Sequence, residues 1–193
     1  AGILIRHITA QRVITVTSEF DRYFRNNEFT RAETVLAPAL KFRNLSVERW
    51  MSLLKRSFSV SSVTADFTFF HDLAARAAAD LPGNKTLAAM NMYSLMRMGR
   101  YREAVEFGKG IAQDDRFETL TGEAYIRAGI QNMEEMNLQA RPRNPVLAAA
   151  SSRNPDFFLN AARITNDARF TLDGALICLE NGDIDRAVSL VRN

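Results

Sequence analysis

Apolar side chains recur at intervals of three and four residues along most of this chain, which is the spacing of one face of an α-helix. The clearest stretch, LAAMNMYSLMRMGRYREAVEFGKGIAQD, covers residues 87–114 and predicts two helices that fold back on each other around Gly99. Weaker examples are ALICLENGDIDRAVSLVRN near the C-terminus and DRYFRNNEFTRAETVL near the N-terminus. Gly and Asn at these corners tolerate the positive φ that ends a helix, so the pattern predicts antiparallel helix pairs.

The rest of the chain divides into helical segments in the same way. One helix is expected to begin at Ser18, which can cap it, and another at Ser46. The run SFSVSSVT at 57–64 is expected to connect two helices. Further helices are predicted over 29–36, 65–80, 117–128, 130–139, 146–150, 156–164, 168–180 and 184–191. Because no stretch makes a convincing strand, the predicted fold class is all-α, without a sheet.

Two local signals complete the predicted layout. Asn144-Pro145 and Asn154-Pro155 each have the form of an N-cap followed by proline at the first helical position. Residues 2–17 are rich in β-branched side chains, which suit either an extended arm or the opening of a helix. We therefore expect an N-terminal arm over 1–17 and a single helical-repeat domain over 18–193.

The corner of the clearest helix pair recurs at fixed offsets. When Gly99 is aligned with Gly182, Ala104 falls on Ala187, and a valine follows in both stretches. Asn27 aligns with Gly99 in a similar way. The offsets of 72 and 83 residues fit two repeats of about 36 and two of about 41 residues, with degenerate units between them. Periods of this size indicate a helical-repeat array, in which neighbouring repeats bury each other's apolar faces.

The segments GRYREAVEFGKGI and NGDIDRAVSLV resemble the second half of pentatricopeptide (PPR) or tetratricopeptide (TPR) repeats. Both families place Gly at the corner and Ala five residues later. The TPR pattern also has Trp early in its first helix and Pro at the end of its second, and neither is present here, so the resemblance is closer to PPR. It implies an α-solenoid of about five to six helical hairpins.

RNA-binding PPR proteins read bases with a polar residue early in the first helix and another at the end of the repeat. In the two clear units the early position falls on Ala89 and Leu172, neither of which can hydrogen-bond a base. The end position of the first unit falls on Thr119. Neither unit has a complete reading pair, so the resemblance implies a scaffold more than an RNA reader.

The chain carries a net charge of +3 with a pI of 9.3, and all but four of its 25 cations are arginine. Two groups of residues are candidates for binding a partner. They are Arg97, Arg100, Tyr101 and Arg102 at the corner of the clearest pair, and Arg141, Arg143 and Arg153 around the Asn-Pro turns. Such groups can contact phosphates or carboxylates of a partner. Alternatively, they are solvated corners whose cations offset the negative ends of helices.

The sequence offers little for catalysis. Cys178 is the only cysteine, which excludes an internal disulfide, and its apolar surroundings favour a buried thiol. His7 and His71 are the only histidines, and no HExxH, GxSxG, Walker or GxGxxG motif occurs. We therefore expect no catalytic residue, no cofactor and no metal site, and we expect that the protein is not an enzyme.

No apolar run is long enough to span a membrane. The first 18 residues contain Arg6, His7 and Arg12 but no acid, which resembles the mature edge of a protein imported into mitochondria. Trimming of the chain explains the same feature. The mitochondrial matrix is the preferred location, and the cytoplasm is the alternative.

These observations lead to two main hypotheses. The first is a non-catalytic helical-repeat subunit that binds other proteins as an accessory or scaffold in a larger, mitochondrial complex. Short Arg-rich chains with a degenerate PPR pattern resemble accessory subunits of euglenozoan mitochondria, including the one attached to the F1 head of ATP synthase. The second is a PPR-type RNA-binding protein of organellar RNA metabolism or the mitoribosome. An enzyme is the third and weakest alternative.

Overall fold

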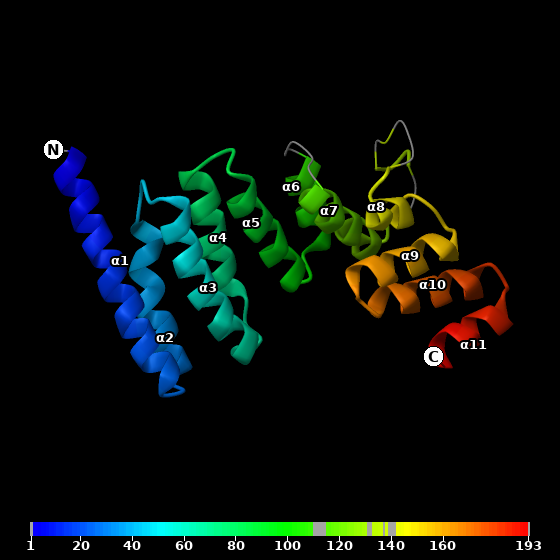
Figure 1. Ribbon diagram of the computed structural model, residues 1–193, viewed down its shortest axis with the longest axis horizontal. Helices are drawn as coiled ribbons and strands as arrows, with labels where there is room; N and C mark the ends of the chain where they lie inside the picture. The colour runs from blue at the N-terminus through cyan, green and yellow to red at the C-terminus, as the bar shows by residue number, and fades with distance from the viewer. Residues whose placement is uncertain (1, 110–114, 131–132, 137, 139–141, 193) are drawn as a thin grey trace. The chain divides into compact units, whose positions relative to one another are not determined.

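A computed structural model describes residues 2–109, 115–130, 133–136, 138 and 142–192. Within these ranges the chain forms eleven α-helices and one 3₁₀ helix, with no strand (Figure 1). This confirms the all-α prediction and agrees with the helical hairpins that the repeat pattern implies. The chain divides into two compact units, residues 1–99 and 100–193. The single domain expected over 18–193 stays a prediction.

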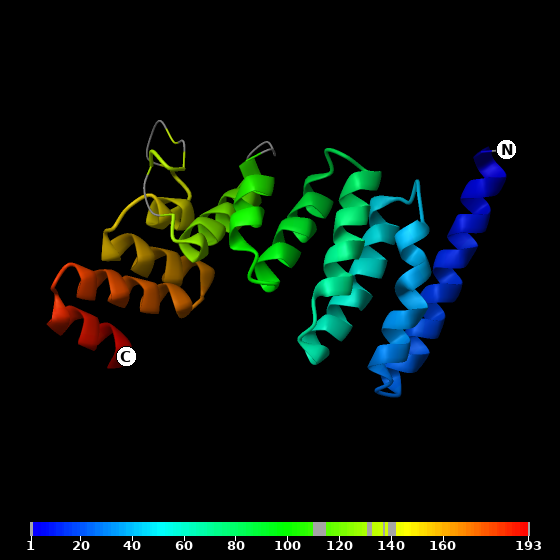
Figure 2. The same cartoon turned by 180° about the vertical axis from the view of Figure 1, so that it is seen from behind.

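Unit 1 is a row of antiparallel helices in which each packs on the next (Figures 1 and 2). Its elements are α1 (Gly2–Arg25), α2 (Phe29–Leu36), η1 (Ala37–Lys41), α3 (Val47–Thr64), α4 (Thr68–Asp80) and α5 (Lys85–Arg97). Trp50, Leu53, Phe70 and Leu73 are almost completely buried at its centre. Their spacing of three to four residues places them on the inward faces of α3 and α4, as the helical pattern predicts.

Asp80, at the end of α4, joins three parts of unit 1. Its carboxylate accepts hydrogen bonds from Trp50 Nε1 at 2.9 Å, from the backbone N–H groups of Asn44 at 3.0 Å and Leu45 at 3.2 Å, and from Arg76 Nη2 at 3.2 Å. Burial by itself raises the pKa of Asp80, but these hydrogen bonds and the Arg76 charge outweigh it and hold the pKa below its usual value. The carboxylate therefore fixes the loop before α3 against α4.

Two sequence predictions for unit 1 are wrong, and the structure decides between two alternatives that the sequence left open. The run 57–64 does not connect two helices, because α3 continues through it to Thr64. Ser18 caps nothing, since α1 runs unbroken from Gly2 to Arg25 and Ser18 lies inside it. The same helix decides between the two alternatives for residues 2–17 in favour of a helix.

Hydroxyl groups make a helix possible over the serine-rich run. Ser59, Ser62 and Thr64 each donate to the carbonyl oxygen four residues earlier, at 2.8–3.1 Å. These bonds satisfy the hydroxyl groups without drawing the backbone out of the helix. Ser57 and Ser61 are fully buried, so this face of α3 offers small side chains to its neighbours. The helix ends at Ala65, whose φ of 60° is left-handed.

The predicted pair at 87–114 is divided between the two units. Gly99 makes the expected turn with a φ of 72°, but the boundary between the units falls directly after it. Helix α5 belongs to unit 1 and packs on α4, whereas α6 (Tyr101–Lys109) belongs to unit 2 and packs on α7. Residues 110–114 of this stretch lie outside the described part of the chain.

Unit 2 continues with α7 (Asp115–Ala128), α8 (Pro145–Ala150), α9 (Pro155–Thr165), α10 (Arg169–Glu180) and α11 (Ile184–Arg192). Asn144 and Asn154 cap α8 and α9 as predicted, because their side-chain oxygens accept from backbone N–H groups two or three residues later. Phe158, Phe170 and Cys178 lie buried between α9 and α10, which confirms the buried thiol.

The helix predicted over 130–139 is not present in the described part of that segment. Residues 133–136 form turns, and the backbone N–H of Leu138 donates to the carbonyl of Met133 at 2.8 Å. Ile130 and Met136 are nevertheless buried. The three-residue spacing of apolar side chains therefore reflected burial here, without the backbone geometry of a helix.

Candidate functional site

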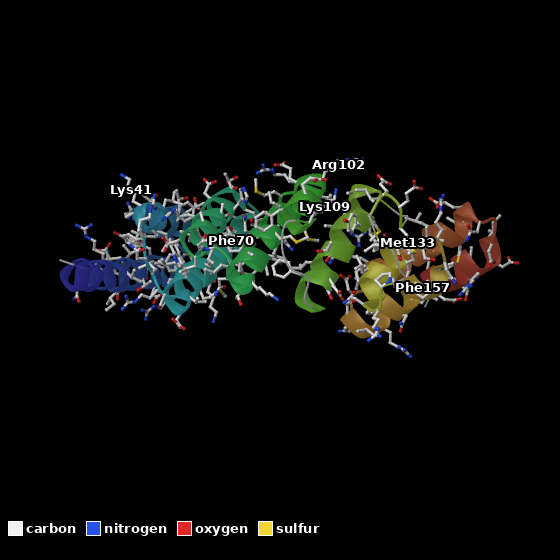
Figure 3. All side chains as sticks on the ribbon, turned by 90° about the horizontal axis from the view of Figure 1, so that it is seen from above. Lys41, Phe70, Arg102, Lys109, Met133 and Phe157 are labelled. Atoms are coloured by element: carbon white, nitrogen blue, oxygen red, sulfur yellow. The ribbon has the colours of Figure 1, made fainter. Side chains whose placement is uncertain are left out.

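The arginines predicted to bind a partner lie in both units. Arg97 is the last residue of α5 in unit 1, and its guanidinium lies over the ring of Phe67, 4.6 Å from the centroid. Arg100 and Glu103 of unit 2 form a bidentate pair, with nitrogen–oxygen distances of 2.7 and 2.6 Å. Tyr101 is half-buried at the start of α6, and Arg102 is exposed and extends outward from that helix (Figure 3).

The second group lies beside α8. Arg143 is exposed just before this helix, and Arg153, which follows it, forms an ion pair with Glu180 at the end of α10. Arg141 lies outside the described residues. Arg100 and Arg153 thus already have carboxylate partners within unit 2, and Arg97 stacks on an aromatic ring. The use of these cations to bind a partner stays a prediction.

The three positions that the PPR resemblance assigns to base reading lie within the described residues. Ala89 is buried and Leu172 is half-exposed. The hydroxyl of Thr119 accepts a hydrogen bond from Asn144 Nδ2 at 3.0 Å, which ties α7 to the cap of α8. The settings of Ala89 and Thr119 therefore do not favour reading a base, and the exposed Leu172 has no group that can hydrogen-bond one.

The phenylalanines of α4 and α9, and Phe67 just before α4, are buried or half-buried. Phe67, Phe70 and Phe158 are 6% exposed or less, while Phe69 and Phe157 are half-buried. Phe70 lies among the helices of unit 1 (Figure 3). Its ring is 5.6 Å from that of Phe58. Packing accounts for these residues better than a partner does.

The feature that the sequence interpretation missed is the outer face of the last helix pair. Six large apolar side chains on α10 and α11 are between 40% and 63% exposed. They are Leu172, Leu176 and Leu179 on α10, and Ile184, Val188 and Val191 on α11. On each helix they follow the spacing i, i+4, i+7, so each trio forms one stripe. We call the surface made by these six residues the terminal face.

A groove of about 560 Å³ runs between the two stripes. Ala175 and Ala187 form its floor and are 4% and 3% exposed. The walls are leucines of α10 and valines of α11, and Arg192 is the one charged residue among the side chains that line it. Small residues below and large ones at the sides make a channel that an apolar side chain can enter.

Helix α10 is apolar on two sides, which explains why one side stays uncovered. Phe170, Ile177 and Cys178 face inward, and α10 packs on α9. Gly174 allows the close approach, since a Cβ atom there would lie 3.3 Å from Cβ of Phe158. Leu172, Leu176 and Leu179 are left for the opposite side.

Helix α11 packs on α10 and is joined to α9 by one exposed ion pair. Gly182 has a φ of 79°, which lets the chain reverse after α10. The backbone N–H of Arg186 donates to Asp183 Oδ1 at 3.2 Å, and the Arg186 side chain forms an ion pair with Asp156 of α9. Ala187 is its buried residue. A sequence signal for the terminal face existed: α10 has more apolar positions than a single face can hold.

Ionised pairs on the inner side of α10 fix its orientation. Arg127 of α7 donates to Asp173 at 2.9 Å, and both side chains are largely buried. Arg169 pairs with Asp167 at 2.6 Å and with Glu123 of α7 at 3.0 Å. The hydrogen bonds from Arg169 hold the pKa of Asp167 below its usual value despite partial burial. Two ion pairs therefore join α10 to α7, while its apolar inner side packs on α9 and the terminal face is left outward.

Unit 1 contains a second, smaller apolar groove of about 350 Å³ between α3 and α5. Its lining residues are Met51, Leu54, Lys55, Phe58, Phe70, Met90 and Tyr93. Part of this lining also belongs to the aromatic cluster of the unit 1 core.

The described residues hold no group of three potential metal ligands, and none of the helices formed by them is long and apolar enough to cross a membrane. No family model matches the chain, and no curated protein matches its sequence. Solved structures that are similar to it include MamA from residue 41 to its end, from Desulfovibrio magneticus RS-1, and a double mutant of the RS-1 MamA. Both align with a TM-score of 0.57 and 11% identity over 94% of this chain, and over 92% and 91% of the respective MamA chains. At this identity the likeness concerns the fold alone, and the fold is an all-α helical repeat.

Proposed function

We propose that this protein is a non-catalytic helical-repeat scaffold that binds other proteins through the terminal face. The observation that carries the proposal is the exposure of six large apolar side chains on one helix pair. Contiguous apolar surface of this kind, bordered by charged residues, marks interaction sites on folded proteins. Three large apolar side chains elsewhere in the described residues are comparably exposed, namely Ile14, Val63 and Ile164, one each on α1, α3 and α9.

The size of the face indicates how it must be used. Complete burial of a Leu, Ile or Val side chain stabilises by about 1.5–3 kcal/mol. Since the six residues are about half-exposed, covering what remains contributes about 5–9 kcal/mol in total. Loss of translational and rotational freedom on association costs about 4–15 kcal/mol. The two sums are comparable, so a stable complex needs most of the face at once, and two substitutions in it are enough to abolish binding.

The test uses a charged double variant and a matched control. Leu176→Glu with Val188→Glu places two carboxylates in the groove. Val63→Glu with Ile164→Glu adds the same charge at exposed apolar positions outside it. Tagged versions of the wild type and both variants are expressed in the native cell, and the proteins that co-purify are quantified by mass spectrometry. Circular dichroism checks that both variants are folded.

We expect a set of proteins in near-stoichiometric amount with the wild type and with the control. The terminal-face variant should lose that set by at least about tenfold, because each buried carboxylate costs several kcal/mol. If the wild type elutes alone as a stable monomer, or if the terminal-face variant retains the same proteins, the proposal is wrong.

The finer form of the proposal places the protein in the mitochondrial matrix, as an accessory subunit of a complex such as the F1 head of ATP synthase. Its support is the acid-poor, basic sequence before Glu19 and the Arg-rich PPR-like repeats. Fractionation of mitochondria tests it directly. The protein should co-migrate with the intact complex on native gels, and its recovery in another compartment contradicts this form alone.

Binding of RNA is the second candidate function, and it rests on the exposed Arg102 and Arg143. Contacts with phosphates release counterions, so an RNA complex should weaken steeply as salt rises. Titration of the intact protein into a labelled single-stranded RNA at low and high salt tests this. Absence of binding at low salt removes the RNA hypothesis and leaves the protein-binding proposal unaffected.

A further inference from the structure

We infer that the terminal face accepts an amphipathic helix of a partner protein, which packs on α11 in the way that α7 packs on α6. This inference rests on the proposed function and names the kind of partner. It follows from the repeat relation between α6 and α11, from the different burial of their equivalent residues, and from the position of one cation.

The offset of 83 residues places α6 on α11. Ala104 of α6 and its equivalent Ala187 of α11 are 0% and 3% exposed, so both helices turn the same residue inward. Gly99 and Gly182 precede the two helices with φ angles of 72° and 79°. The two helices therefore begin in the same way and bury the same position, although α6 packs on α7, which follows it, and α11 packs on α10, which precedes it.

The adjacent position shows what α11 lacks. Val105 of α6 is 1% exposed, whereas its equivalent Val188 is 40% exposed. Within unit 2, α6 packs on α7, which contributes the buried side chains Phe117, Ala124 and Tyr125. Among the described helices, α10 is the one that packs extensively on α11. Val188 therefore lies on a part of α11 that α10 leaves open, and a further helix is the element that can cover it as the equivalent valine of α6 is covered.

The charge at the end of the groove fits the same arrangement. Lys109 of α6 is equivalent to Arg192 of α11 under the same offset. Lys109 interacts electrostatically with Tyr125 of α7: burial raises the pKa of Tyr125, and the Lys109 ammonium opposes that rise. Arg192 lines the groove at the corresponding place. A partner helix is expected to set a carboxylate or a tyrosine ring against this guanidinium.

The partner helix can therefore be specified by its pattern. It carries an aromatic residue and a small residue seven positions later on one face, as Phe117 and Ala124 do in α7. A tyrosine or acid follows directly after the small residue, where Tyr125 stands. Small residues allow the close approach that the alanine floor of the groove invites.

The probe for the test is the α7 sequence itself. A fluorescein-labelled peptide of residues 115–128, DRFETLTGEAYIRA, is too short to be stably helical in water, so it is stapled. The staple joins the positions of Glu123 and Arg127, because these side chains contact α10 in unit 2 and their loss leaves the rest of the helix unchanged. Fluorescence anisotropy measures its binding to the intact protein, and a stapled peptide of scrambled sequence is the control.

We expect saturable binding to the wild type and to the Val63→Glu/Ile164→Glu control. Binding to the Leu176→Glu/Val188→Glu variant should be weaker by at least about tenfold. Changing the tyrosine of the peptide to alanine, or Arg192 to Ala in the protein, should each weaken binding, and the two changes together should be less than additive. Absence of peptide binding at millimolar concentration, or binding that ignores the terminal-face variant, overturns the inference.

Analytical ultracentrifugation distinguishes the competing occupant. If the wild type is a dimer that the Leu176→Glu/Val188→Glu variant converts to a monomer, a second copy covers the face and the partner-helix inference is wrong. The co-purification experiment stays separate from both outcomes. Proteins lost with that variant, together with a peptide that does not bind, mean that the face docks a partner of a different shape. A peptide that binds while no proteins are lost means that the proposed function is wrong.

Discussion

Replacement of Asp80 should strongly destabilise unit 1, since this one carboxylate serves groups from three places in the chain. Its side chain is 5% exposed and accepts from Trp50 Nε1, from two backbone N–H groups in the loop before α3, and from Arg76. In Asp80→Ala all four acceptor contacts disappear. Trp50 is fully buried, so its indole N–H has no access to water.

The expected loss can be estimated from these contacts. Removing one partner from a buried, hydrogen-bonded charged group costs about 3–5 kcal/mol in the free energy of unfolding. The loop N–H of Asn44 can be hydrated again because Asn44 is exposed, which favours the lower part of this range. Asp80→Asn keeps one acceptor oxygen, and we expect it to lose about 1–3 kcal/mol. These values are a large part of the stability of a typical domain.

Urea denaturation followed by the fluorescence of Trp50, the only tryptophan, reports on unit 1 directly. The pH dependence supplies a second test. The folded-state pKa of Asp80 is lowered, so its contribution is fully present above the unfolded-state value of about 3.9 and is lost as the pH falls through the folded-state pKa. The difference in stability between the wild type and Asp80→Asn should therefore shrink below about pH 4.

A loss below about 0.5 kcal/mol for Asp80→Ala at neutral pH would refute the reasoning, because surface substitutions have effects of that size. A difference that stays constant down to pH 2 would also refute the assignment of the stabilising species as the carboxylate. Glu33→Gln is a suitable control, since Glu33 is an acid of the same unit whose pKa is raised by burial.

Three further predictions concern unit 2. Gly122→Ala should destabilise unit 2 by about 1–3 kcal/mol despite the better helix propensity of alanine, because its Cβ would lie 2.7 Å from the backbone nitrogen of Leu147. Urea denaturation measures this loss of stability, and an unchanged midpoint contradicts the close contact of α7 and α8. Arg127→Met should cost about 1.5–3 kcal/mol by leaving the largely buried Asp173 without its cation, and adding Asp173→Leu should recover part of that loss in a double-mutant cycle. Val188→Ser should change the free energy of unfolding by less than about 0.5 kcal/mol but reduce bis-ANS fluorescence, and a large loss of stability would show that the terminal face is not open.

Local chemistry accounts for the features that were predicted correctly from the sequence. An asparagine before a proline caps a helix wherever its own backbone allows, so Asn144 and Asn154 could be recognised without knowledge of the fold. The same holds for the left-handed turns at Gly99 and Gly182 and for the burial of Cys178 within an apolar run. Each of these depends on a few neighbouring residues.

Local chemistry also explains two of the errors. Serine residues predict a helix start at Ser18 and a connector at 57–64, and both predictions are wrong. In the structure the serine and threonine hydroxyls of the second run donate to carbonyl groups one turn earlier, and the helix continues. The choice between these outcomes depends on whether neighbouring helices cover the small faces of α3, as they cover Ser57 and Ser61.

The Asp80 cluster and the terminal face were decided by tertiary structure alone. Asp80 meets groups 30 to 36 residues away, and nothing near it in the sequence indicates them. Val105 and Val188 occupy the same place in the repeat and each follows an alanine, yet one is buried and the other is open. The sequence determines that a helix has an apolar stripe; whether that stripe becomes core or a binding surface depends on which helix packs against it.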